Sequence, residues 1–145
     1  MSEKEGFTPL APKRRSDSLN KTMLGHNGPV WVFAYGSLLW QPSFKETDRK
    51  RARLQGYQRS FCLWSALARG TPEQMGLGLG LIKDERAICE GVALRTESDN
   101  RNDQLTALWD REMWTDAYIP AWKQLDTDDG RIDALVFKAN RCSRQ

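Results

Sequence analysis

The sequence has few of the residues on which metal and thiol chemistry depends, with three cysteines and one histidine among 145 residues. Cys62, Cys89 and Cys142 stand far apart without a C-x-x-C pair, and their odd number leaves at least one thiol unpaired. The lone His26 leaves no Ser-His-Asp or Cys-His catalytic set. We therefore expect no metal site, and reduced thiols in the cytoplasm fit this usage best.

Long apolar runs and a strong charge of one sign are also missing. No stretch approaches the roughly 18 consecutive apolar residues of a membrane span, and no charged start followed by an apolar run is present. The net charge is only +3, with short basic clusters at residues 13–15 and 49–51. The expectation is a soluble cytoplasmic protein that binds neither membrane nor nucleic acid and slightly favours small anions.

The length is enough for one compact domain with a real core and too short for two. Residues 1–28 are rich in Lys, Ser, Pro and Gly and carry no sustained apolar period. They are predicted to form a flexible N-terminal tail, followed by a domain over residues 29–145.

Several strands are predicted within that domain. Residues 30–35 form a continuous apolar, β-prone run, which suits a strand buried on both faces. A second strand covers residues 52–65, with a bulge at Gly56. Residues 75–82 alternate leucine and glycine, and residues 88–94 form a further strand. The G-x-G-x-G spelling is not a dinucleotide fingerprint, because no helix pattern follows it.

One helix and one hairpin complete the prediction. The helix begins near residues 98–100, which offer capping side chains, and continues to about Met113. Residues 122–125 and 132–137 form a hairpin around the turn 126–130, whose acidic residues lack the distal Glu of a calcium loop. The fold class is α+β, with a mixed or antiparallel sheet that can close into a barrel.

Glu112 is the residue of this helix that stands out. At about 100° per residue, Glu112 falls in the middle of the apolar face formed by Leu105, Leu108, Trp109 and Met113. Burial disfavours the charged form of a carboxyl and raises its pKa, which gives a proton shuttle usable near neutral pH. The alternative is that Glu112 turns outward at the helix end and pairs with an arginine such as Arg111 or Arg95.

A second candidate site follows the first strand. The strand stops at Gly36, and the backbone N–H groups after Tyr35 lose their ladder partners. Such groups can hold an anion, particularly a carboxylate. The alternative is a plain turn with a small residue at the bend.

At these two places the chain resembles the ChaC-like γ-glutamylcyclotransferases of the glutathione-specific type. Their hallmarks are a strand ending in Y-G-S-L and a glutamate in an L-W-x-R-E-M segment, which here are residues 35–38 and 108–113. The likeness covers roughly residues 29–138. It also includes L-x-G-Y at 54–57, R-x-F-C at 59–62, R-G-T-P-E at 69–73, G-V-A at 91–93 and Y-x-P-x-W at 118–122.

The resemblance implies a small mixed β-barrel with helices packed around it and one main catalytic helix. It implies a lyase reaction in which the α-amine of a γ-glutamyl peptide, characteristically glutathione, attacks its own γ-carbonyl. The products are 5-oxoproline and the released amine, here cysteinylglycine, and no metal or organic cofactor is needed. Other γ-glutamyl amines are an alternative substrate class.

The resemblance also implies residue roles. Glu112 is the catalytic acid/base, and the backbone of Gly36, Ser37 and Leu38 holds the glutamyl α-carboxylate. The further substrate-binding candidates are Tyr35, as the pocket floor, with Ser65, Arg69 and Tyr118. Arg69 could meet the glycyl carboxylate or simply be solvated, and Tyr118 could donate a hydrogen bond near Glu112 or serve in packing.

The end of the chain departs from the family pattern. Relatives of this type usually continue beyond the terminal hairpin, whereas residues 140–145 are polar and carry no family motif. The domain is therefore expected to be shortened at its C-terminus. That leaves open a catalytically dead or regulatory γ-glutamyl-binding protein, and it predicts a homodimer, a partner protein or poor solubility.

Overall fold

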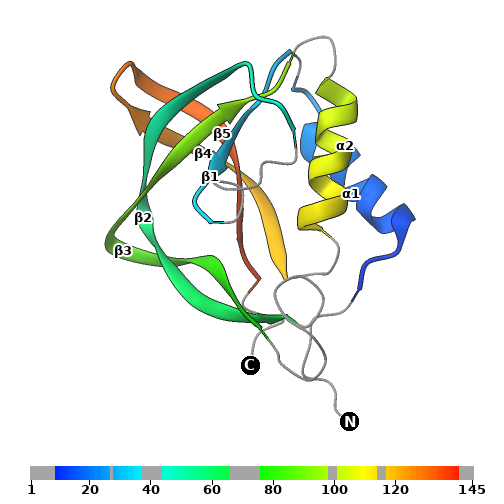
Figure 1. Cartoon of the computed structure of the whole chain (residues 1–145), viewed down its shortest axis with the longest axis horizontal. Helices are drawn as coiled ribbons and strands as arrows, with labels where there is room; N and C mark the ends of the chain where they lie inside the picture. The colour runs from blue at the N-terminus through cyan, green and yellow to red at the C-terminus, as the bar shows by residue number, and fades with distance from the viewer. Residues whose placement is uncertain are drawn as a thin grey trace.

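In a computed structural model, the described part of the chain folds as a five-stranded barrel with two helices on one side (Figure 1). The structure describes residues 9–26, 28–36, 44–65, 76–97, 101–113 and 117–140, and for 61–65 and 76–79 it describes the backbone only. In chain order the elements are α1 (Pro12–Met23), β1 (Trp31–Ala34), β2 (Asp48–Ser65), β3 (Gly76–Arg95), α2 (Arg101–Glu112), β4 (Tyr118–Thr127) and β5 (Gly130–Ala139).

The strands close in the order β1-β3-β2-β4-β5, with β5 returning to β1. The β1 and β5 pair is parallel and every other pair is antiparallel, so the predicted mixed barrel is confirmed. Alternate residues of each strand face inward. They fill the barrel with one buried cluster: Phe33, Tyr35, Ala52, Leu54, Tyr57, Leu81, Cys89, Ala93, Leu125, Ala134 and Val136.

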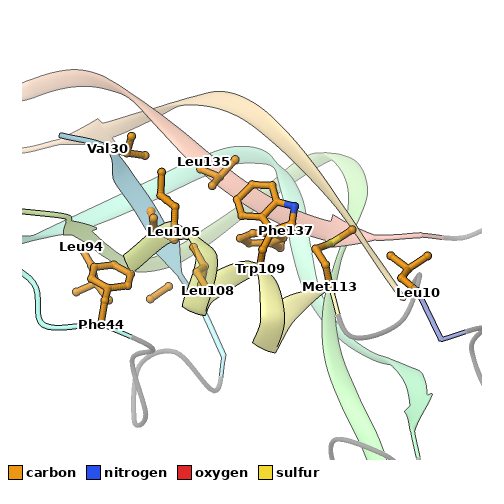
Figure 2. Close-up of a cluster of buried hydrophobic side chains, with 12 residues drawn as sticks. Leu10, Val30, Phe44, Leu94, Leu105, Leu108, Trp109, Met113, Leu135 and Phe137 are labelled. Carbon is orange, nitrogen blue, oxygen red and sulfur yellow. The ribbon is translucent and has the colours of Figure 1, made fainter. Parts of the chain in front are cut away.

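A second buried cluster joins the outer face of β1 and β5 to the helices, and Figure 2 shows its side chains. Val32, Leu135 and Phe137 of the sheet pack there against Leu105 and Leu108 of α2. Burial of each such leucine contributes roughly 1.5–3 kcal/mol. The apolar face of α2 is thereby fixed against the barrel wall.

The prediction of two separate strands over residues 75–82 and 88–94 was wrong, because both belong to β3. Gln55 of β2 faces Ile88, whereas Tyr57 faces Lys83, so residues 84–87 of β3 lie opposite the single residue Gly56. Gly56 has φ +88°, a conformation that favours glycine, and the predicted bulge there is confirmed. Residues 84–87 are the irregular part of one long strand.

The prediction of a flexible tail over residues 1–28 was wrong for Pro12–Met23, which form α1. Pro12 sits at the start of the helix, where its missing N–H costs nothing, and Lys13 pairs with Asp17 one turn later at 3.1 Å. No residue of α1 is fully buried. Leu19 and Met23, four residues apart, pack against the second buried cluster, the one between the barrel and the helices, which we call the outer cluster. Too few apolar residues repeat for a periodicity search to find this helix.

Candidate active site

Glu112 is the last residue of α2 and lies on its buried face. It is 9% exposed, and Leu105, Leu108 and Trp109 of the same face are at most 1% exposed. The helical projection of the sequence is therefore confirmed. Asp103 and Asp110, which the projection placed on the far side, are exposed.

The carboxylate of Glu112 forms an ion pair with the preceding residue, Arg111. Arg111 Nε lies 3.4 Å from Glu112 Oε2, with the two side chains 27% and 8% exposed. The outward-turned alternative was thus right about Arg111 as a partner and wrong about the direction of the side chain. A half-buried guanidinium beside a buried carboxylate offsets part of the cost of removing that charge from water.

The last turn of α2 lies where the first and last strands of the barrel end. Because β1 and β5 run parallel, their carboxyl ends share one end of the barrel. The Tyr35 hydroxyl donates a hydrogen bond of 2.5 Å to the backbone oxygen of Phe137. The Phe137 ring meets the Trp109 ring edge to face at 5.2 Å between centroids. Contacts therefore run from the Tyr-Gly turn through β5 to the helix turn that carries Glu112. Figure 2 shows the Trp109 and Phe137 rings of this series.

The start of β4 reaches the same end of the barrel. Tyr118 pairs with Ala139 in the β4–β5 ladder, and Asn140 N–H donates to the Ala117 carbonyl at 2.9 Å. The Tyr118 side chain is partly buried and packs against both the outer cluster and the small cluster of Ala117 and Ala139. Packing is one of the two roles expected for Tyr118, and its hydrogen bond near Glu112 or the reacting carbonyl stays a prediction.

The remaining candidate residues are described only in part. Tyr35 is 6% exposed, with its ring among the barrel-filling residues, and Gly36 is buried directly after it. Ser65 closes β2, but its side chain is outside the described part, and Ser37, Leu38 and Arg69 lie outside the described residues altogether. Their proposed roles therefore stay predictions.

Gly91 of β3 supports the end of β1 from inside the barrel. A Cβ at this position would lie 2.5 Å from the Ala34 carbonyl oxygen and 2.8 Å from Phe33 Cε1. Only a residue without a side chain lets the two backbones approach this closely. Gly91 thus sets the position of the strand end that leads into Tyr35 and Gly36.

Cys89, two residues earlier, is a buried free thiol inside the barrel. Burial raises the pKa of the Cys89 thiol, and the nearby Arg59 guanidinium opposes that shift without overcoming it. Such a thiol is a packing residue and a poor nucleophile.

Two features of the described residues bear on the class of site. Among them, no three His, Cys, Asp or Glu side chains stand close enough to hold a metal ion. Within the same ranges, no helix has both the length and the apolar content needed to cross a membrane.

Comparison with known proteins identifies the family. The model of the family described as "ChaC-like protein" matches residues 30–145. A glutathione-specific γ-glutamylcyclotransferase of Escherichia coli is 43% identical over 128 residues, covering 86% of this chain and 54% of that protein. The human glutathione-specific γ-glutamylcyclotransferase 1 is 30% identical over 136 residues, covering 91% and 58%.

The fold has a match among solved structures as well. A γ-glutamyl cyclotransferase specific to glutathione from yeast superposes with a TM-score of 0.70 at 19% identity, over 78% of this chain and 69% of that one. The chain spans a little over half the length of its E. coli and human relatives. The family model nevertheless covers most of the chain and both candidate motifs, and the chain belongs to the ChaC-like protein family.

Proposed function

We propose that this protein is a γ-glutamylcyclotransferase, a lyase that converts glutathione to 5-oxoproline and cysteinylglycine. The observation that carries the proposal is Glu112, a carboxylate only 9% exposed at the barrel end where β1 runs into the Tyr35-Gly36 turn. The E. coli relative named for this activity, at 43% identity, supports the same substrate.

The reaction needs few protein groups, because both reacting groups belong to the substrate. The α-amine nitrogen attacks the γ-carbonyl carbon and closes a five-membered ring, and the bond from that carbon to the cysteinyl nitrogen breaks. The attack is already intramolecular, so the protein needs only to hold the glutamyl chain folded with the amine close to the γ-carbonyl. The proposed chemistry therefore requires no metal or organic cofactor.

Glu112 is the proton carrier of this proposal. The attacking amine loses one proton as the ring closes, and the departing cysteinyl nitrogen gains one. A single carboxylate beside both nitrogens can accept the first proton and then donate it to the second. Glu112 has the buried environment for this role, and its partner Arg111 stabilises the carboxylate before it accepts the first proton and after it has donated the proton again.

The Tyr35-Gly36 turn is the proposed anchor for the substrate. Backbone N–H groups of Gly36, Ser37 and Leu38 bind the glutamyl α-carboxylate, while Tyr35, tied to β5 through its hydroxyl, supports them from below. Ser65, Arg69 and Tyr118 are proposed to complete the pocket, with Arg69 directed to the glycyl carboxylate. The protein is further proposed to act in the cytoplasm and to form a homodimer.

The test is incubation of the purified chain with glutathione, followed by quantification of both products by mass spectrometry. The proposal expects 5-oxoproline and cysteinylglycine in equal amounts, increasing with enzyme concentration. A panel of other γ-glutamyl amines tests whether glutathione is the preferred substrate. If one of these amines is turned over faster than glutathione, that amine replaces glutathione as the proposed substrate. Glutathione binding by calorimetry without any product would instead support the regulatory γ-glutamyl-binding alternative.

A further inference from the structure

Helix α1 lies before the residues matched by the family model, which begin at residue 30. It nevertheless packs beside α2, the helix that carries Glu112, on the same side of the barrel (Figure 1). Several polar contacts join α1 to α2 and to β4, and two of them involve residues in the last turn of α2.

The first contact holds the indole of Trp109. This side chain is 1% exposed, and its Nε1–H donates a hydrogen bond of 3.1 Å to Ser18 Oγ of α1. A buried indole N–H without a partner is costly, so this bond fixes where the ring can sit. Trp109 lies three residues before Glu112, on the same face of the helix.

The second contact holds the next residue of α2. Arg15 Nε lies 3.4 Å from Asp110 Oδ1, and Arg15 is only 15% exposed while Asp110 is 61% exposed. The Arg15 guanidinium also donates from an Nη atom to the Leu10 carbonyl at 2.7 Å, which ties it to its own segment. Consecutive residues of the last turn, Trp109 and Asp110, are therefore both held by α1.

Two further contacts fix α1 itself in place. Leu10, 7% exposed, belongs to the same buried cluster as Met113, the residue after Glu112 (Figure 2). At the other end of α1, Trp122 of β4 donates its indole N–H to the Thr22 carbonyl at 2.9 Å. Helix α1 is thus attached at both ends, with Ser18 and Arg15 between them.

We propose that α1 is a positioning element for the catalytic carboxylate, with Ser18 as its main positioning residue. Through Trp109 it sets the rotation of the last turn of α2 and hence the direction of the Glu112 side chain. This inference rests on the function proposed above. It assigns a role in the reaction to a segment outside the family match.

Ser18→Ala tests the proposal, with Ser16→Ala as the matched control. Ser16 is exposed on the same helix, so both variants gain the same helix propensity and only one loses the bond to Trp109. For one lost hydrogen bond we expect kcat to fall about 5-fold in Ser18→Ala, with KM unchanged. Ser18→Thr, which keeps the hydroxyl, is expected to recover most of the loss. Equal kcat in the two alanine variants would overturn the proposal, as would a change confined to KM.

Hydrogen exchange of the whole chain, read on peptides covering residues 105–113, supplies a readout independent of turnover. Ser18→Ala is expected to speed exchange there about 5-fold, and Ser16→Ala is not. If no form of the protein turns over glutathione but this difference appears, the proposed function fails and α1 still positions α2. If turnover is normal and exchange is the same in both variants, α1 has no positioning role.

Discussion

Gly91→Ala gives a direct test of how the barrel supports the end of β1. The added methyl group would lie 2.5 Å from the Ala34 carbonyl oxygen and 2.8 Å from Phe33 Cε1. The ring can shift, but the carbonyl is part of a strand paired on both sides. One extra carbon in a closed core lowers the free energy of unfolding by about 1–3 kcal/mol. Alanine also makes the unfolded chain less flexible than glycine does, which raises the free energy of unfolding by about 0.4–1 kcal/mol.

The net loss should be about 1–2 kcal/mol, which for a domain of this size lowers Tm by roughly 3–8 °C. Differential scanning calorimetry of Gly91→Ala beside Glu90→Ala, an exposed change on the same strand, measures it. Glu90→Ala should melt near the wild type. Turnover of glutathione should also fall in Gly91→Ala, because the displaced strand end leads into Gly36. A Gly91→Ala protein as stable as the wild type would contradict the described packing of β3 on β1.

Two further predictions concern polar groups inside the barrel. Tyr35→Phe removes the buried hydrogen bond to the Phe137 carbonyl, so urea unfolding should show a loss of about 0.5–1.5 kcal/mol; an unchanged midpoint would contradict the bond. Burial raises the pKa of the Cys89 thiol, so in a Cys62→Ser/Cys142→Ser protein iodoacetamide should react slowly at pH 8 in the native state and fast in urea. As pH rises, the Cys89 thiol ionises in the unfolded chain before it ionises in the folded protein. The contribution of Cys89 to the free energy of unfolding is therefore complete below a pH of about 8.5 and falls as pH rises through that value. Rapid alkylation of the native protein would refute the burial.

Much of the barrel could be predicted from local sequence. The apolar run 30–35 predicted β1, whose residues Val32 to Ala34 are at most 1% exposed. The turn residues 126–130 predicted the hairpin of β4 and β5, which is confirmed. These signals are local, since they depend on the period of a strand and on turn chemistry.

Other features depend on partners far along the chain and could not be predicted in this way. The irregular part of β3 depends on its pairing with β2 around Gly56, more than 25 residues away along the chain. Helix α1 is stabilised by contacts with residues 91 and 100 positions away, Trp109 and Trp122, and not by its own composition. At the candidate site, the helical period placed Glu112 on the apolar face of α2. No sequence signal showed that Trp109, three residues earlier, donates a hydrogen bond to Ser18.

The central claim is that Glu112 carries the proton in the cyclisation of a γ-glutamyl group. Glu112→Gln keeps the size of the side chain and removes its ability to accept a proton, and Asp103→Asn makes the same change at an exposed acid of the same helix. The direct measurement is the rate of 5-oxoproline formation from glutathione by the wild type and both variants, with folding verified by circular dichroism. The account predicts a loss of at least about 100-fold for Glu112→Gln and little change for Asp103→Asn. A folded Glu112→Gln protein that forms 5-oxoproline at the wild-type rate would contradict it.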